Sequence, residues 1–525
     1  QTITNHPKPD TRFPEPISPT FYSPTHYSYT SIIIFAPFMS KQEESLKKII
    51  SHCKEYGFVF PSSEIYDGLS AVYDYGHNGI ELKKNLREYW WKAMVQMHEN
   101  IVGIDAAIFM HPKVWKASGH VDGFNDPMID NKDSKKRYRA DQLLEDRIAK
   151  YEKEGKTEKA SALQSAMDEA LGANDLPRLK QLIEEQEIAC PISGTRNWTD
   201  VRQFNLMYST QMGSLAEDAD EVYLRPETAQ GIFVNFLNVQ KTGRMKVPFG
   251  IAQTGKAFRN EIIARQFIMR MREFEQMEMQ FFVRPGTEME WFEYWKNYRM
   301  NWHRALGVPA EKYRFHEHTK LAHYANAAVD IEYEFPFGFK EVEGIHSRTD
   351  FDLKQHQEFS GKKLQYFDPE INQNYVPYVV ETSIGLDRMF LLTMFHCLQE
   401  ETIENEDKTD TRTVLRLPNV LAPVKLAVFP LVKKDGLPEK AREIINSLKF
   451  DYTCLYEEKD AIGKRYRRQD AIGTPFCVTV DYDTMEDNTV TLRYRDSMEQ
   501  KRVAIADLPG IIAEEISWKK VLNFQ

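Results

Sequence analysis

Stretches of two-residue hydrophobic period alternate along this chain with stretches of helical period. Residues 1–38 have neither; they are rich in Pro, Ser, Thr and Tyr. Met39 then opens a helix-like stretch in which Leu46, Ile49 and Ile50 share one face. We therefore expect residues 1–38 to be a disordered leader that is not native to the protein, with Met39 as the natural start.

A charged region of helical period occupies residues 140–188 and contains no β-branched runs. This pattern predicts a helical insertion at about 141–189 on the surface of a larger domain. Contact with a partner and a passive helical hairpin both fit the pattern, so its role stays open.

Two predicted strands, within residues 249–261 and 272–282, flank a polar loop. With period two, Arg259 and Glu261 share one face of the first strand. The second strand has a polar and an apolar face, which predicts a half-buried sheet whose polar face forms a functional surface. A solvent-facing sheet with alternating charges also fits this pattern. The polar face carries Phe274, Gln276 and Glu278, and the apolar face carries Met277, Met279 and Phe281.

A third segment, residues 378–390, reads as a short apolar strand followed by a helix. Glu381 and Ser383 alternate onto one strand face, and Gly385 permits a close turn. Arg388 then falls in the first helical turn, where the macrodipole disfavours a cation, so we expect an anionic partner nearby. An ordinary strand-to-helix turn fits the segment equally well.

The hydrophobic pattern restarts near residues 418–423. A strand at 424–429, a helix at 438–448 and strands at 477–480 and 489–494 follow. They predict a separate α/β domain over residues 421–525.

Composition adds limits to this picture. A chain of 525 residues with 42% hydrophobic content favours two or three domains. No apolar run approaches the roughly 18 residues of a membrane span. The five cysteines form no Cys-x-x-Cys pair, which indicates reduced thiols and a cytoplasmic location.

Net charge is −10, a weak argument against a nucleic-acid partner because clustering matters more than the total. Basic residues cluster at 132–139 and 464–468. Taken alone, each cluster also fits an ordinary charged surface that is exposed to solvent.

The segments around the functional surface resemble motifs 2 and 3 of the class II aminoacyl-tRNA synthetases. The matching runs are Phe258-Arg259-Asn260-Glu261 and Gly385-Leu386-Asp387-Arg388. Residues 223–231, 272–278 and 463–470 further resemble glycyl-tRNA synthetases of the homodimeric type, and the resemblance extends from about residue 57 to 503.

This resemblance implies an α+β fold. An antiparallel sheet of six or seven strands flanked by helices would form the catalytic domain at 39–420, with the helical insertion within it. Residues 421–525 would be an α/β anticodon-binding domain. The implied activity is ATP-dependent activation of glycine and its transfer to the 3′ end of tRNA(Gly) by a homodimer that uses ATP and Mg²⁺.

The resemblance also implies roles for single residues. Arg259 would hold the α-phosphate of ATP and Arg388 the γ-phosphate, as the catalytic residues, while Phe274 stacks on adenine. The implied ATP-binding residues are Arg259, Asn260, Glu261, Met269, Arg270, Met271, Arg272, Glu273, Phe274, Glu341, Val342, Gly385, Leu386, Asp387 and Arg388. The implied glycine-binding residues are Arg139, Glu227, Phe274, Glu275, Gln276, Met277, Glu278, Glu381, Thr382, Ser383, Ile384 and Gly385.

Further partners follow from the same resemblance. Glu341 and Glu381 would be the carboxylates near a nucleotide-bound Mg²⁺. Phosphate contacts by basic side chains bind tRNA in a salt-dependent way. The expected tRNA-contacting residues are Lys464, Arg465, Arg467 and Arg468.

The chain departs from the family at the zinc site that many relatives carry. Asn131, Ser134, Cys190 and Ser193 stand at the four cysteine positions of that site. One thiolate cannot build a four-cysteine site, so we expect no structural zinc.

Two further departures lie near the substrate motifs. Thr382 replaces a usual proline, but Glu381 and Ser383 remain, so we expect activity to survive. His77 also replaces a usual proline, ahead of a helix expected at the dimer interface. An ordinary core helix fits that segment too, because Leu82, Leu86, Trp90 and Met94 recur at helical spacing.

Two other functions fit parts of the sequence. A relative that charges threonine, proline or histidine would share the C-terminal domain type, but the acidic set Glu227, Glu278 and Glu381 argues for glycine. A non-catalytic tRNA-binding accessory protein would be expected to lose the motif arginines, and Arg259 and Arg388 are both present.

Overall fold

The computed structural model describes residues 41–524 except 214–219, 263–265, 320, 323 and 406–407. Residues 41–525 cluster as one compact unit. The expected leader at 1–38 and the start at Met39 lie outside the described residues. Within these, no helix combines the length and the apolar character that crossing a bilayer requires.

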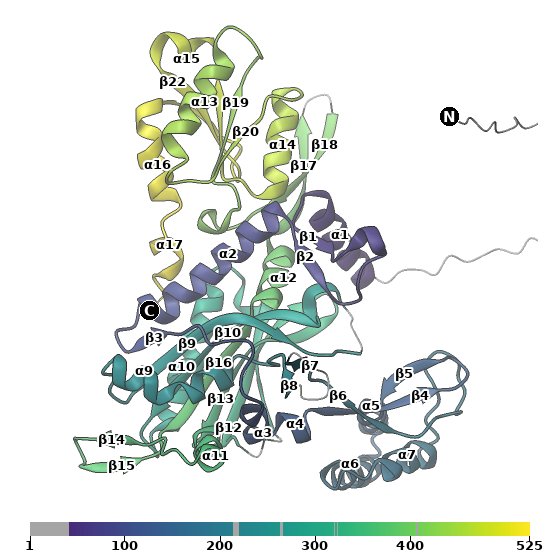
Figure 1. The fold of residues 1–525 in the computed structure, drawn as a ribbon. Helices are drawn as coiled ribbons and strands as arrows, with labels where there is room; N and C mark the ends of the chain where they lie inside the picture. The colour runs from purple at the N-terminus through teal and green to yellow at the C-terminus, as the bar shows by residue number, and fades with distance from the viewer. Residues whose placement is uncertain are drawn as a thin grey trace, which may run out of the picture. The chain divides into compact units, whose positions relative to one another are not determined.

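A seven-stranded sheet forms the centre of the fold (Figure 1). Its strand order is β11-β12-β13-β16-β10-β9-β3, and every pair is antiparallel except β3 with β9. This arrangement confirms the antiparallel sheet of the predicted α+β class. The strands are β3 (Ile101–Gly103), β9 (Phe249–Phe258), β10 (Glu273–Val283), β11 (Tyr313–Glu317), β12 (Ala327–Phe335), β13 (Gly338–Thr349) and β16 (Tyr378–Gly385).

Strand β10 has the two faces that its alternation predicts. Met277, Met279 and Phe281 are buried in the main hydrophobic core. The helices that pack on this side of the sheet include α10 (Glu288–Arg304) and α12 (Leu386–Cys397). The helices α8 (Ala229–Val234) and α11 (Phe351–Ser360) belong to a second core that also takes in Phe249 and Phe282 of the sheet.

Helix α2 (His77–Trp91), continued by a π-helical turn η2 (Lys92–Gln96), is a core helix. All four of the side chains at helical spacing, Leu82, Leu86, Trp90 and Met94, are fully buried within the chain's own core. These four side chains therefore face inward.

His77 begins α2 where a proline was expected. Its ring packs against Gly57, which has a φ of +69°. The left-handed backbone favours glycine there, and a Cβ atom at position 57 would lie 2.3 Å from His77 Cε1, so the ring would have to shift.

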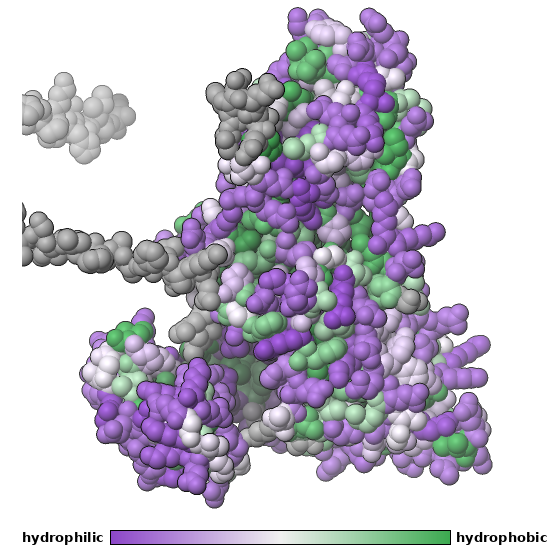
Figure 2. All heavy atoms as spheres, turned by 180° about the vertical axis from the view of Figure 1, so that it is seen from behind, coloured by the Kyte–Doolittle hydropathy of each residue, from purple (hydrophilic) through white to green (hydrophobic). Residues whose placement is uncertain are grey.

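The insertion folds around its own small core. It consists of a three-stranded sheet of order β5-β4-β6 and three helices, and is therefore wider than the helical range expected from the sequence. Its helices present a mainly hydrophilic surface in Figure 2. The elements are β4 (Asn125–Asn131), β5 (Lys136–Arg139), α5 (Ala140–Lys153), α6 (Thr157–Gly172), α7 (Leu176–Glu185) and β6 (Arg202–Asn205).

The C-terminal unit is an α/β fold, as predicted. Its sheet has the order β20-β19-β21-β22-β23, in which β19 is parallel to both neighbours and the other pairs are antiparallel. The elements are β19 (Leu426–Pro430), α13 (Leu437–Leu448), β20 (Cys454–Tyr456), α14 (Ile462–Ile472), β21 (Phe476–Val480), α15 (Tyr482–Asp487), β22 (Thr489–Tyr494), β23 (Gln500–Ala504) and α16 (Leu508–Glu515).

The last helix, α17 (Lys519–Leu522), returns to the main core beside α2 (Figure 1). Val521 and Leu522 are buried in that core. The Tyr89 hydroxyl donates to Val521 O at 3.2 Å, and its ring stacks on Trp518. The end of the expected 421–525 domain thus packs with the first domain.

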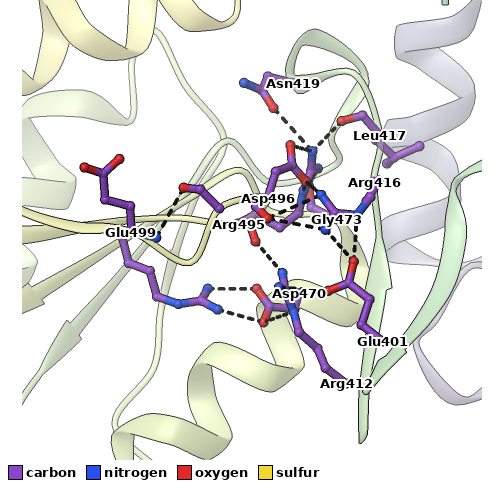
Figure 3. A network of polar contacts seen from close by, with 12 residues as sticks. Glu401, Arg412, Arg416, Leu417, Asn419, Asp470, Gly473, Arg495, Asp496 and Glu499 are labelled. Carbon is purple, nitrogen blue, oxygen red and sulfur yellow. Dashed lines mark hydrogen bonds and ion pairs between the residues drawn. The ribbon is translucent and has the colours of Figure 1, made fainter. Parts of the chain in front are cut away.

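Buried ion pairs join the hairpin of β17 (Leu398–Asn405) and β18 (Lys408–Leu415) to the C-terminal unit (Figure 3). Arg412 is fully buried, with its Nε 3.0 Å from Asp470 Oδ2. Asp470 also accepts two hydrogen bonds from Arg493, at 2.8 and 3.0 Å. Arg495 donates to Leu417 O at 2.7 Å. These contacts fix the C-terminal unit to β18 and to the segment that follows it.

The remaining elements are short or peripheral. They are α1 (Lys41–Glu55), β1 (Val59–Pro61), β2 (Tyr73–Tyr75), α3 (Pro112–Ala117), α4 (His120–Gly123), β7 (Ser209–Met212), β8 (Asp220–Tyr223), α9 (Phe236–Thr242), β14 (Tyr366–Asp368) and β15 (Gln373–Tyr375), with 3₁₀ turns η1 (Glu64–Tyr66), η3 (Phe267–Met269), η4 (Ala310–Lys312), η5 (Asn419–Leu421) and η6 (Ile505–Asp507).

Candidate active site

A cavity of about 270 Å³ lies on the polar face of the central sheet, over β10, β13 and β16. It gathers most of the residues expected at the site. The expected residues in its lining are Glu227, Arg259, Glu261, Met269, Arg270, Met271, Phe274, Glu275, Gln276, Glu278, Glu341, Glu381, Ser383, Gly385, Asp387 and Arg388.

Other expected residues do not line this cavity. Asn260, Arg272 and Glu273 lie in or beside the loop that follows β9, outside the lining. The side chains of Met277, Val342, Thr382, Ile384 and Leu386 are buried in the protein, so only their backbone could meet a ligand.

Arg139 also does not line this cavity. It lines an adjoining cavity of about 730 Å³ that shares Met269, Arg270, Glu341 and Arg388 with the first. Its guanidinium is paired with Asp126 and Asp141 of the insertion, at 3.2 and 2.5 Å. The structure thus places Arg139 in this adjoining cavity, and its expected contact with glycine stays a prediction.

The sequence pattern placed Arg259 and Glu261 on the first strand. In the structure β9 ends at Phe258, so both residues follow the strand. The strand ends because Asn260 N donates to Leu206 O, outside the sheet. Arg259 Nε donates to Pro226 O at 3.1 Å, and its Cζ lies 5.3 Å from the centre of the Phe274 ring.

Arg388 lies in the first turn of α12, as predicted, and its expected anionic partner is Glu341. Arg388 Nη1 lies 3.0 Å from Glu341 Oε1 and donates to Glu341 O at 3.1 Å. The Arg388 charge lowers the pKa of Glu341 below its ordinary value. Gly385 has an ordinary φ of −78°, so its backbone conformation does not require glycine.

Asp387 is a structural link between motifs. Its Oδ1 accepts from Tyr75 OH at 2.5 Å and Lys83 Nζ at 2.7 Å, and its Oδ2 accepts from Glu275 N at 2.7 Å. Because it is almost fully buried and uses both oxygens, Asp387 holds α12 against β10 and α2.

Three glutamates line the same cavity, of which Glu278 and Glu381 are buried and Glu227 is half-buried. Glu278 accepts hydrogen bonds from Thr228 Oγ1 at 2.6 Å and Ser383 Oγ at 2.8 Å. Burial, together with the charges of Glu381 and Glu227, raises the pKa of Glu278 to about 8.

The other two glutamates face positive charge. Glu381 Oε1 lies 2.8 Å from His346 Nδ1, and Oε2 lies 3.2 Å from Arg348 Nη1. Burial alone would raise the pKa of Glu381, but Arg348 and His346 lower it below its ordinary value. The pKa of Glu227 is lowered in the same way, by His120, which outweighs the effect of burial.

Several lining residues were missed by sequence reasoning. Tyr324, Gly344, His346 and Arg348 also line the cavity. The last three alternate along β13, so the period-two pattern that identified β10 could have found them. Arg348 is in turn held by Asp352, through hydrogen bonds of 2.8 and 3.0 Å.

The two proposed magnesium ligands differ in availability. Glu381 already accepts from Gln280 Nε2 at 2.7 Å besides its pairs with His346 and Arg348. The Glu341 side chain is 49% exposed. Glu341 therefore fits a nucleotide-bound Mg²⁺ and Glu381 does not.

The four positions that correspond to zinc cysteines in relatives do come together. Ser134 Oγ lies 3.3 Å from Cys190 Sγ, and Ser193 Oγ donates to Asn131 Oδ1 at 3.0 Å. Asn131 Oδ1 also accepts from Ser134 N at 2.9 Å. Hydrogen bonds thus join these four side chains, which do not fit a zinc ion. Across the described ranges, no group of three or more His, Cys, Asp or Glu residues could hold a metal.

The expected tRNA residues lie on α14 of the C-terminal unit. Arg465 is buried and donates to Pro430 O at 2.6 Å and Asp460 O at 3.0 Å, so its expected role in binding tRNA is wrong and its role is structural. Arg467 pairs with Asp410 at 2.7 Å. Lys464 is exposed.

Comparisons with known families agree with this architecture. Residues 208–396 match the family described as tRNA synthetase class II core domain (G, H, P, S and T). Residues 126–162 and 155–206 match glycyl-tRNA synthetase insertion domain 1, and residues 425–515 match the anticodon binding domain.

Curated relatives align over almost the whole described chain. A glycine–tRNA ligase of Chlorobaculum tepidum is 54% identical over 473 residues, which are 90% of this chain and 100% of that protein. Those of Macrococcus caseolyticus and Treponema denticola are 51% and 50% identical, over 91% of this chain and 100% and 98% of theirs. The chain therefore belongs to the glycine–tRNA ligase family of class II aminoacyl-tRNA synthetases.

Proposed function

We propose that this chain activates glycine with ATP and transfers the glycyl group to the 3′ end of tRNA(Gly). The observation that carries the proposal is one cavity that combines buried glutamates with Arg259 and Arg388. Glu278 lies four residues beyond Phe274 on β10, about 13 Å further along the strand. That separation suits an amino acid and a nucleotide bound side by side.

In the first step, a carboxylate oxygen of glycine attacks the α-phosphorus of ATP. The bond from that phosphorus to pyrophosphate breaks, and glycyl-adenylate forms. The chain needs no nucleophile of its own, because the work is alignment of two anions and stabilisation of charge on the phosphoryl oxygens. Arg259 and Arg388 supply that charge through planar guanidinium groups.

A magnesium ion bound with ATP would neutralise phosphate charge, and Glu341 is the carboxylate able to hold it. Phe274 provides an aromatic face for adenine, and Glu261 lies in the same lining. Together these residues form the nucleotide side of the proposed site.

The glycine ammonium group would bind among Glu227, Glu278 and Glu381. Each contact is a charge-assisted hydrogen bond, which supplies affinity for a substrate that has no side chain. Glycine is preferred over alanine because a methyl group would overpack the site, at a cost of about 1–3 kcal/mol.

In the second step, a ribose hydroxyl of the terminal tRNA adenosine attacks the carbonyl carbon of glycyl-adenylate, and the bond to AMP breaks. The C-terminal unit would hold the anticodon. Its basic candidates are the exposed Lys464 and, more weakly because they are half-buried and paired, Arg467 and Arg468.

We further propose that the protein works as a cytoplasmic homodimer. The exposed apolar side chains of Met97 and Tyr294 line one hollow beyond η2 and along α10, next to the element expected at the interface. The described cysteines are all free, as a reducing compartment requires. Light scattering on the purified protein should give twice the 61.4 kDa chain mass.

The decisive experiment is ATP–pyrophosphate exchange with each of the twenty amino acids, followed by charging of tRNA(Gly). Exchange with glycine alone, and charging, are expected. Exchange with threonine, proline or histidine would overturn the glycine assignment. No exchange by intact protein would favour a non-catalytic tRNA-binding role.

A further inference from the structure

A short turn at the root of the insertion contacts residues of both proposed subsites. It comprises α4 (His120–Gly123) and Phe124, immediately before the first insertion strand β4. None of its residues lines the cavity itself. Its side chains instead touch two residues that do, Glu227 and Arg259.

His120 meets the glycine side. Its Nε2 lies 3.4 Å from Glu227 Oε2, and its Nδ1 lies 2.8 Å from Ser118 Oγ. Its ring stands edge-on to Trp115, which is fully buried, with 5.6 Å between the ring centres. The imidazole is therefore held from two sides and presents its remaining nitrogen to the glutamate.

Phe124 meets the nucleotide side. Arg259 Cζ lies 5.4 Å from the centre of the Phe124 ring and 5.3 Å from that of Phe274. A guanidinium over aromatic faces is attracted by their quadrupoles and loses freedom to turn. The Phe124 and His120 rings are themselves 5.3 Å apart.

Backbone hydrogen bonds also connect this turn to the loop that carries Arg259. Leu206 N donates to Phe124 O at 3.1 Å, and Leu206 O accepts from Asn260 N at 2.8 Å. Because Asn260 follows Arg259, two consecutive hydrogen bonds tie the turn to the loop that carries the arginine. The turn and the loop are thus connected by side chains and by backbone.

We propose that His120 and Phe124 are positioning residues, through which the root of the insertion orients Glu227 for glycine and Arg259 for ATP. This proposal rests on the proposed function. It predicts separable effects, since each side chain contacts only one of the two substrate-binding residues.

Steady-state ATP–pyrophosphate exchange tests the proposal. Phe124→Leu should raise the KM for ATP and lower kcat, with a combined loss of about tenfold, while the KM for glycine changes less than about twofold. Phe124→Trp keeps an aromatic face and should restore most of the loss. His120→Gln should raise the KM for glycine and leave that for ATP within about twofold.

Matched controls are Phe367→Leu, an exposed phenylalanine of β14, and His111→Gln, an exposed histidine. Thermal unfolding of each variant identifies loss of fold. Equal losses in Phe124→Leu and Phe124→Trp, or parallel changes in both KM values, would overturn the proposal. Absence of glycine-dependent exchange in the unaltered protein would instead overturn the proposed function.

Discussion

At the residue scale, the three glutamates of the cavity differ in the side chains that face them. Glu381 lies against Arg348, and Glu227 lies against His120. Glu278 is contacted by neutral donors, and its pKa rises to about 8. The ammonium group of glycine supplies the positive charge that Glu278 lacks.

Replacement of Glu278 is the sharpest test of this assignment. Glu278→Ala should raise the KM for glycine by roughly 10- to 100-fold, the value of a charge-assisted hydrogen bond, and the KM for ATP far less. Glu334→Ala, at an exposed paired glutamate on β12 of the same sheet, is the matched control. Equal effects on both substrates would contradict the assignment.

The raised pKa of Glu278 also predicts a pH dependence. The side chain is neutral below about pH 8 and charged above it, so the KM for glycine should fall as pH rises from about 7 to 9. Glycine binding near pH 7 should release a proton, detectable by calorimetry in buffers of different ionisation enthalpy. A flat KM profile in the unaltered protein would refute this.

Single-strand patterns predicted Phe274, Gln276 and Glu278, because residues two apart on one strand must share a face. They could not predict the pair of Arg348 with Glu381, which are 33 residues apart and meet only because β13 pairs with β16. Likewise, a basic run cannot show that Arg465 points inward; only packing against neighbouring carbonyls decides that.

At the element scale, a buried amide holds the base of the insertion, where three of the four expected zinc positions carry no thiol. Asn131 is fully buried. Its Nδ2 donates to Thr195 Oγ1 at 3.2 Å and Asn197 O at 3.3 Å, in addition to the bonds that its Oδ1 accepts. One amide therefore ties together segments that are 64 and 66 residues away in sequence.

Restoring the missing thiols should create a metal site. We expect Asn131→Cys with Ser134→Cys and Ser193→Cys, added to Cys190, to bind one zinc per chain, since four thiolates complete a tetrahedral set. Elemental analysis of the purified proteins checks this. The unaltered protein should contain none, and stoichiometric zinc in it would refute the expectation.

At the scale of the whole molecule, buried charges hold the C-terminal unit on the hairpin of β17 and β18 (Figure 3). Sequence reasoning predicted both folds but not this joint, because it is formed by arginines and aspartates from separate segments. Arg412 crosses from the hairpin to Asp470, while Arg416 lies at the partly exposed rim.

Arg412→Met should therefore loosen the C-terminal unit. Removing one partner of a buried ion pair costs about 3–5 kcal/mol, and we expect tRNA charging to fall well below its normal rate while pyrophosphate exchange is kept. Arg416→Met is the control and should have a smaller effect. Scanning calorimetry with both assays measures this; equal loss of exchange and charging would contradict it.

The return of α17 to the main core has a consequence for how the protein is made. Val521 and Leu522 complete packing around Tyr89, yet the ribosome adds them after the whole anticodon-binding unit. At roughly 5–20 residues per second, that unit occupies the ribosome for about 5–20 s. During this interval the nascent catalytic core exposes an unfilled apolar surface, which makes it a natural client for chaperones until synthesis ends.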